Sequence, residues 1–197
     1  KKDYVSLGSY YWPNLNLMEG EPYIYEDGRV NPEREDLDRY DGRRMQVMVG
    51  NLRALARGYA VSHQEKFAER AMDLVDAWFL SSATRMNPHI LYAQSIPGLW
   101  HGDDAGILDT VLFLEVLDDL EMLDGSKAYT RARKDGLRSW FGAYAEWLRT
   151  SPQGKAMGAA RNGQGVWYDA QVAAFSRFAG HEDIAKDVLR AVPMRRM

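Results

Sequence analysis

The sequence predicts an all-α protein built from antiparallel helical hairpins. After residue 36, apolar residues recur at three- and four-residue steps through most of the chain. No useful length of sequence shows the alternation of apolar and polar residues that is typical of a half-buried strand. Helix, short turn, helix and long loop recur with a spacing of tens of residues, which favours an α-solenoid or an α/α toroid over a four-helix bundle. We therefore expect an incomplete α/α toroid with long loops at one end.

Residues 1–34 form the first long loop. The segment combines aromatic side chains with prolines and glycines in an order that has no helical period. A loop of this length is uncommon as a simple connection and is more often functional. We expect its aromatic residues to contribute to a site.

The first two helices are predicted between residue 36 and about residue 80. An amphipathic face marks the first helix: Met45, Met48, Leu52, Leu55 and Tyr59. The second helix is predicted to begin at a capping box, in which Ser62 and Glu65 satisfy each other's backbone donors. Residues 82–106, with an Asn-Pro and a Pro-Gly turn, are predicted to form a second long loop.

The remaining helices are predicted from residue 107 onward. Residues 107–123 are apolar on most faces, which indicates a helix inside the molecule, and residues 124–126 (DGS) are predicted to end it and to cap the next helix. That next helix carries Trp140 and Trp147, which we expect in the core with Trp78. Residues 151–165 hold four glycines and are predicted to be a third loop. Helices at about 166–179 and 182–192 follow.

Composition excludes several classes of function. The net charge is −3 and the pI is near 5.8, which argues against a broad nucleic-acid surface. A polyanionic ligand would therefore have to meet a local cluster of positive or donor groups. No apolar run approaches the roughly 20 residues of a membrane span. The absence of cysteine excludes disulfides, thiolate metal sites and a cysteine nucleophile.

The length of 197 residues fits a single domain, residues 1–197. The first residues, Lys1 to Tyr4, begin abruptly and show no apolar signal-peptide region. We expect a domain trimmed at both ends, with a leader already removed. An opened toroid leaves apolar faces of its terminal helices unpaired, so self-association as a homo-oligomer is a further expectation.

Three segments share an unusual density of aromatic, amide and glycine residues. They are residues 3–7 (DYVSL), 10–14 (YYWPN), 22–24 (PYI) and 27–32 (DGRVNP); residues 77–80 (AWFL), 86–94 (MNPHILYAQ) and 96–98 (IPG); and residues 162–171 (NGQGVWYDAQ). In this order, the segments resemble the alginate lyase family of polysaccharide lyases. The resemblance spans residues 3 to about 192. It implies that the segments line a cleft for a uronic acid polymer.

The resemblance implies cleavage of alginate, glucuronan or a related polyuronate by β-elimination. A base removes the C5 proton, an acid protonates the departing O4, and donors first neutralise the substrate carboxylate. The implied catalytic residues are Asn162, Gln164 and Tyr168. The implied substrate-binding residues are Tyr11, Trp12, Asn87, Gln94 and Trp167. The resemblance implies no cofactor and no metal, an acidic polysaccharide as partner, and a periplasmic or extracellular location.

One departure from the family pattern affects this assignment. The family's third segment reads Asn-Asn-His-Gly, whereas this chain has Gly163 and Gln164 in place of the second Asn and the His. Glutamine can donate a hydrogen bond to a carboxylate, but it cannot exchange a proton at neutral pH. The family's later Arg and Tyr are also missing, unless Arg195 or Arg196 substitutes. The chain is therefore either a lyase or a relative that binds a polyuronate without cutting it.

Each candidate also has an ordinary structural interpretation. The aromatic residues Tyr11, Trp12, Trp167 and Tyr168 could fill the core, and the amides could form turns or lie in solvent. His101 with Asp103 and Asp104 matches no metal-ligand spacing. A glycoside hydrolase remains an alternative, with Asp118, Asp119 and Glu121, or Asp103 and Asp104, as its carboxylates. Adjacent helical residues point in different directions, so Asp118 and Asp119 make a poor catalytic pair.

Overall fold

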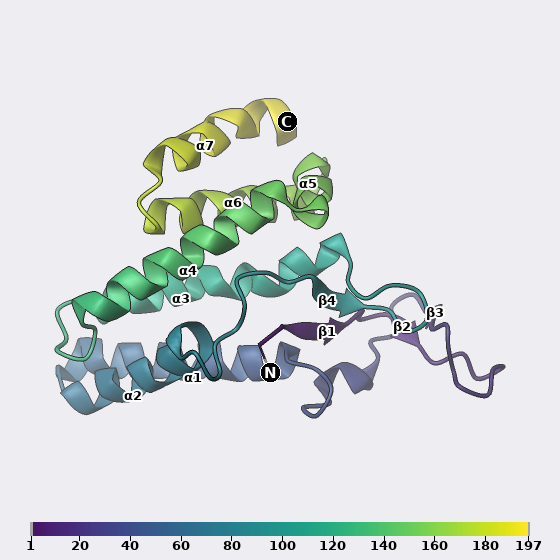
Figure 1. Ribbon diagram of the computed structural model, residues 1–197, viewed down its shortest axis with the longest axis horizontal. Coiled ribbons are helices and arrows are strands. Elements are labelled where there is room, and N and C mark those ends of the chain that lie inside the picture. Colours follow the sequence, from purple (N-terminus) through teal and green to yellow (C-terminus); the bar gives the residue numbers. More distant parts are fainter. Residues whose placement is uncertain (1, 197) are drawn as a thin grey trace.

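The computed structural model describes residues 2–196, which form helical hairpins stacked in layers (Figure 1). The helices are α1 (Gly42–Ser62), α2 (Glu65–Val75), α3 (Leu112–Met122), α4 (Arg131–Thr150), α5 (Pro152–Ala159), α6 (Gly163–Phe178) and α7 (Glu182–Arg196). Short helical segments add η1 (Pro32–Glu35), the π-helix η2 (Asp76–Leu80) and η3 (Asp104–Val111). The prediction of a mostly helical fold is confirmed.

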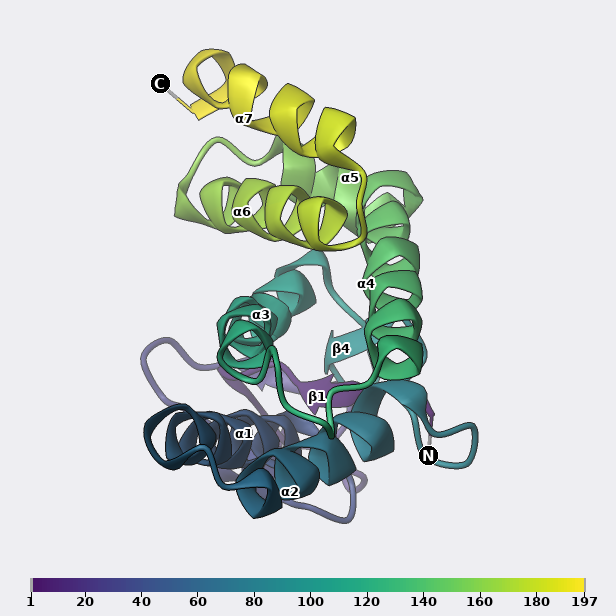
Figure 2. The ribbon, with the colours of Figure 1, turned by 90° about the vertical axis from the view of Figure 1, so that its left-hand side faces the viewer.

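Two hairpins and the two helices between them make up the body of the molecule. Figure 2 shows α1 beside α2 and α6 beneath α7. Between these hairpins, α3 packs on α1 and α4 packs on α6. The short strands and the long N-terminal loop lie at one end of this stack, which is also the end where α5 leads into α6 (Figure 1). The short strands and the N-terminal loop are therefore close to the start of α6.

The hydrophobic core is centred on aromatic side chains from four helical elements. Phe79 of η2 packs edge-on against Phe113 of α3 and Trp140 of α4, with ring centroids 5.3 and 4.8 Å apart. Phe141 continues the cluster to Phe175 of α6 at 5.2 Å. Such edge-to-face pairs contribute about 0.5–1.5 kcal/mol each beyond the area that they bury. Trp140 lies in the core as expected, whereas Trp78 and Trp147 are only partly buried against it.

Four short strands bring distant parts of the chain together. β1 (Val5–Leu7) pairs in parallel with β4 (Tyr92–Ser95), and β2 (Tyr11–Trp12) pairs antiparallel with β3 (Ile24–Tyr25). The sequence predicted no strand, because strands of two to four residues are too short to show an alternating pattern. The β1–β4 pair joins the first and second of the three segments.

The capping box predicted at Ser62 is wrong. Ser62 is the last residue of α1, and its hydroxyl donates to the carbonyl of Gly58 at 2.6 Å. His63 follows in the left-handed region, with φ 54°, and ends the helix. Glu65 accepts instead from the backbone N–H of Lys127, at 3.1 and 3.2 Å. Ser62 therefore ends α1, and Glu65 makes a tertiary contact with Lys127.

Three further features differ from the predicted ones. Residues 151–165 are not one loop, because Ser151 accepts from the N–H of Gly154 at 3.0 Å and caps the added helix α5. A Cβ at Gly154 would collide with the backbone of Leu148, so this glycine permits close packing. The cap of α4 is Thr130, which accepts from the N–H of Arg133. Residues 107–123 divide into η3 and α3.

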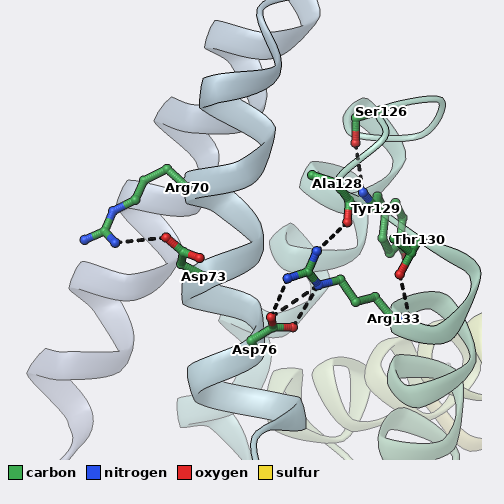
Figure 3. A network of polar contacts seen from close by, with 8 residues as sticks. All are labelled: Arg70, Asp73, Asp76, Ser126, Ala128, Tyr129, Thr130 and Arg133. Carbon is green, nitrogen blue, oxygen red and sulfur yellow. Dashed lines mark hydrogen bonds and ion pairs between the residues drawn. The ribbon is translucent and has the colours of Figure 1, made fainter.

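An arginine fork ties the π-helix η2 to the start of α4 (Figure 3). Arg133 donates to both carboxylate oxygens of Asp76, at 2.6–3.2 Å, and to the carbonyl of Ala128 at 2.7 Å. Such bidentate, charge-assisted contacts fix geometry as well as adding energy. Across residues 2–196, no helix has both the length and the apolar character needed to cross a membrane.

Candidate functional site

Two consecutive residues of η3, Asp109 and Thr110, connect all three segments; we call them the η3 junction. The carboxylate of Asp109 accepts from the hydroxyls of Tyr4 and Ser6, at 3.0 and 2.5 Å, and from the side-chain amide of Gln94 at 3.0 Å. Burial raises the pKa of Asp109, while these three donors oppose that rise. The first and second segments are therefore joined through one partly buried acid.

Thr110 connects the third segment on the other side of η3. Its buried hydroxyl oxygen lies 2.6 Å from the hydroxyl of Tyr144 and 2.8 Å from Oε1 of Gln171 in α6. The amide of Gln171 donates in turn to the carbonyls of Ile107 and Trp167, at 3.1 and 3.3 Å. All polar atoms of this buried contact are paired, as a low-dielectric interior requires. The start of α6 is thereby held at a fixed position relative to η3.

The first turn of α6 carries the exposed polar groups of the third segment. Asn162 is the N-cap, and its Oδ1 accepts from the N–H groups of Gln164 and Gly165, at 3.0 and 3.4 Å. Its Nδ2 lies 3.5 Å from Oε1 of Gln164. Both side chains are exposed, and Nε2 of Gln164 has no partner within residues 2–196. The pair therefore presents neutral N–H donors to solvent.

Trp167 adds an aromatic surface beside these donors. Its side chain is 48% exposed, an unusual state for the largest apolar residue. The indole follows Gln164 by three residues and so shares its face of the helix. Amide donors next to an open aromatic ring are groups suited to a sugar ring with polar substituents.

Tyr168 lies in the core, not on the exposed surface of α6. It is 7% exposed, and its hydroxyl donates to the carbonyl of Leu148 at 3.1 Å. Burial raises the pKa of Tyr168, and the nearby carboxylate of Asp169 raises it further. A tyrosine base at neutral pH needs a lowered pKa, so neither the position nor the pKa of this residue suits proton transfer.

A buried ion pair fixes the loop that precedes α6. Arg196 donates to both oxygens of Asp169, at 2.8 and 3.0 Å, and also to the carbonyls of Gly158 and Ala160. A Cβ at Gly165 would collide with this guanidinium. Because the fork of Arg196 is fully used inside the protein, this residue is not a free substitute for the family's later arginine. Arg195 is exposed, with its guanidinium 4.0 Å from Asp169.

The other four predicted residues make contacts within the protein. The amide of Asn87 donates to Asp3 at 2.7 Å, and Gln94 donates to Asp109 and, at 3.3 Å, to the carbonyl of Ala105. The indole N–H of Trp12 donates to the carbonyl of Arg29 at 2.9 Å, and the guanidinium of Arg29 lies over its ring. Tyr11 is half-buried and packs edge-on against Tyr25.

The carboxylates weighed for a glycoside hydrolase differ in their surroundings. Asp118 is exposed, whereas Asp119 is 2% exposed. Asp103 and Asp104 interact with each other, and burial, followed by the contact with Asp103, raises the pKa of Asp104. Within the described residues, no group of three or more histidine, aspartate or glutamate side chains is placed to hold a metal ion.

The sequence interpretation missed the η3 junction and the Asp169–Arg196 pair. A signal for the first was present, since Asp109 and Thr110 interrupt an apolar run from residue 105 to residue 114. A buried polar residue in such a run needs a partner. No local signal predicts the partner of Asp169, because Arg196 is 27 residues away.

Comparisons with known proteins place this arrangement among the polysaccharide lyases with a helical fold. The family model for alginate lyase matches residues 1–197, and the chain therefore belongs to the alginate lyase family. The resemblance seen in the sequence is confirmed.

A solved structure agrees with this family. The crystal structure of an alginate lyase from Bacteroides ovatus is similar to this chain, with a TM-score of 0.93 and 37% sequence identity. The match covers 98% of this chain and 51% of the other, so the chain spans about half the length of that protein. No curated protein matches the chain significantly.

Proposed function

We propose that this chain acts on a uronic acid polymer of the alginate or glucuronan type, as a polysaccharide lyase that cleaves by β-elimination. Membership of the alginate lyase family carries the proposal. The exposed donors and indole at the start of α6 support it, because they lie in the segment that carries the resemblance. No cofactor is needed for this reaction.

The exposed residues of α6 have roles that follow from their chemistry. Asn162 and Gln164 donate N–H groups to the uronate carboxylate, which lowers the cost of removing the adjacent C5 proton. Trp167 stacks on a sugar ring. Two neutral amides stabilise a carboxylate less than a charged donor does. Further donors are therefore required for the C5 proton to be removed at a useful rate.

The groups that transfer protons are not Gln164 or Tyr168. An amide does not exchange protons at neutral pH, and the hydroxyl of Tyr168 is committed to Leu148. Tyr11, Trp12, Asn87 and Gln94 hold the first and second segments in place, because their polar contacts are to the protein itself. We propose further that the hairpins belong to an incomplete α/α toroid, that the protein self-associates, and that it works in the periplasm or outside the cell.

Absorbance tests the catalytic proposal directly. β-Elimination creates a C4=C5 double bond, so incubation with alginate, polyguluronate, polymannuronate or glucuronan is expected to raise the ultraviolet absorbance. A neutral glucan is the control. Unchanged absorbance on every polyuronate at high protein concentration would rule out the lyase.

A second candidate is binding without cleavage, and Gln164 at the family's histidine position favours it. It predicts retention on immobilised polyuronate with no change in absorbance.

The variant Gln164→His separates the two candidates. If the site lacks only a proton-exchanging group, Gln164→His is expected to raise the rate of absorbance change by about tenfold or more, within the usual contribution of a general acid or base. Gln164→Asn, which keeps a neutral amide, is the matched control. Equal rates for both variants would show that more than one group is missing.

A further inference from the structure

A small cavity lies between η1, the start of α1 and the η3 junction. Its volume is about 40 Å³, which is room for a few water molecules or one carboxylate group, since a single water needs roughly 10–15 Å³. The side chains that matter for its chemistry are Arg34, Glu35, Arg43, Gln46, Ser6 and Asp109. We call it the Arg34–Arg43 pocket.

The guanidinium groups of this pocket make only long contacts, of which the shortest is 3.5 Å, from Nη1 of Arg43 to Oε1 of Gln46. Nε of Arg34 lies 3.8 Å from one oxygen of Glu35, and Nε of Arg43 lies 3.8 Å from the other. Charge-assisted hydrogen bonds are about 2.7–2.9 Å long, so neither contact is one. Arg133 and Arg196, by contrast, use their forks at 2.6–3.2 Å within the fold. The guanidinium groups of the pocket therefore keep donors for a ligand.

The acid at the base of the pocket does not repel an anion strongly. Both oxygens of Asp109 are covered by donors from Tyr4, Ser6 and Gln94. The other acid, Glu35, is 49% exposed at its side chain, and each of its oxygens faces one arginine. Glu35 therefore already places a carboxylate between the two guanidinium groups of this pocket, and its side chain is half-exposed.

We propose that the Arg34–Arg43 pocket binds the carboxylate of a uronic acid unit, which displaces Glu35 from between the two arginines. The proposal rests on the proposed function and adds a second contact for the same polymer. Gln164 and Gln171 lie seven residues apart on α6, roughly 10 Å at 1.5 Å per residue. Gln171 contacts Thr110, and the neighbouring Asp109 lines the pocket. The chain thus carries neutral donors on α6 and charged donors at η1 and α1.

Retention on immobilised polyuronate at about 0.15 M salt tests this site. The double variant Arg34→Gln/Arg43→Gln is expected to weaken retention about tenfold or more, because it removes two charge-assisted contacts. Glu35→Gln is expected to strengthen retention several-fold, because it removes the competing carboxylate. Arg70→Gln/Arg190→Gln is the matched control: it makes the same charge change at two exposed surface pairs, on α2 and α7.

Each result decides the proposal. Weaker retention of the pocket variant alone, with stronger retention of Glu35→Gln, supports it. Equal losses of retention in Arg34→Gln/Arg43→Gln and in the control variant would show that overall charge alone causes the effect, and would overturn the proposal. Wild-type retention of both Arg34→Gln/Arg43→Gln and Glu35→Gln would also overturn it. Circular dichroism confirms that each variant is folded.

A separate measurement tests the pocket in case the proposed function itself is wrong. If wild-type protein is not retained on any polyuronate, monomeric glucuronate is titrated while the Nε–H signals of Arg34 and Arg43 are followed by nuclear magnetic resonance. Shifts of those two signals, absent with neutral glucose, keep the pocket as a carboxylate site. No shift overturns it.

Discussion

Asp119 is a buried acid without a hydrogen-bond partner for one of its oxygens. It lies on α3 and is 2% exposed, and its Oδ2 has no partner within the described residues. Burial raises the pKa of Asp119 to about 6, opposed by Arg53 and Arg57 of α1, with Glu115 and Asp118 of α3 as the facing acids. The folded protein therefore keeps the proton on Asp119 to a higher pH than the unfolded chain does.

The sign of the pH effect follows from this shift. Between pH 4 and pH 6 the folded protein binds a proton at Asp119 that the unfolded chain has released, so the free energy of unfolding falls as the pH rises. Asp119→Asn is expected to reduce this pH-dependent loss of stability by about 1–2 kcal/mol. The reduction is smaller than the full pKa shift implies, because the two arginines and nearby solvent screen the charge. Urea unfolding at pH 4.5 and 7.5 measures it.

The exposed neighbour is the control for this prediction. Asp118→Asn makes the same charge change outside the core and is expected to keep the wild-type dependence on pH. If Asp119→Asn and Asp118→Asn change the dependence equally, burial of Asp119 is not its cause.

At the scale of the element, the N-terminus of α6 combines a structural and a functional role in Asn162. Its Oδ1 caps the helix, whereas its Nδ2 is a donor on the exposed side. Serine can also accept the backbone N–H groups but has no amide donor. Asn162→Ser therefore separates the two roles.

Two variants of Asn162 test this division. Asn162→Ala is expected to lower the free energy of unfolding by about 0.5–2 kcal/mol, whereas Asn162→Ser is expected to stay within about 0.5 kcal/mol of wild type. Both are expected to weaken retention on polyuronate. Wild-type retention of Asn162→Ser would mean that the amide of Asn162 does not touch the polymer.

The apolar periodicity of the sequence predicted which segments form helices, but it did not predict several of the helix ends. The apolar faces of α1 and α4 are continuous in the sequence and were predicted. Ser62 has the side chain of an N-cap, yet it ends α1, because the left-handed conformation of His63 comes directly after it. Gly154 was interpreted as part of a loop, yet it is needed for close contact with Leu148. A local backbone conformation decided the first case, and a close backbone contact decided the second.

The candidate site shows the same limit. Trp167 and Tyr168 are adjacent on α6, and neighbouring side chains on a helix point about 100° apart. The sequence could predict that one faces solvent more than the other, but not which. The packing of Tyr168 against Gly158 and its hydrogen bond to Leu148 place it inside. Asn162 and Gln164 were predicted from the family resemblance alone.

At the scale of the whole molecule, the three segments meet because η3 has polar residues on two sides. Asp109 holds β1 and β4, and Thr110 holds α4 and α6. The hydroxyl of Thr110 lies 2.6 Å from the hydroxyl of Tyr144 and donates to Oε1 of Gln171, so one threonine hydroxyl group links three elements. Removing that hydroxyl leaves two buried polar groups without partners.

Thr110→Val tests whether this junction holds the molecule together. The change keeps the shape but leaves the hydroxyl of Tyr144 and Oε1 of Gln171 unpaired, so the free energy of unfolding is expected to fall by about 2–4 kcal/mol. Thr110→Ser keeps the hydroxyl and loses one methyl group, so its loss is expected to be about 1 kcal/mol. Urea unfolding compares the two, and hydrogen exchange is expected to quicken in the first turns of α6 only for the valine variant. If serine costs as much stability as valine, the methyl group and not the hydroxyl connects η3 to α6, and the start of α6 is positioned by apolar packing.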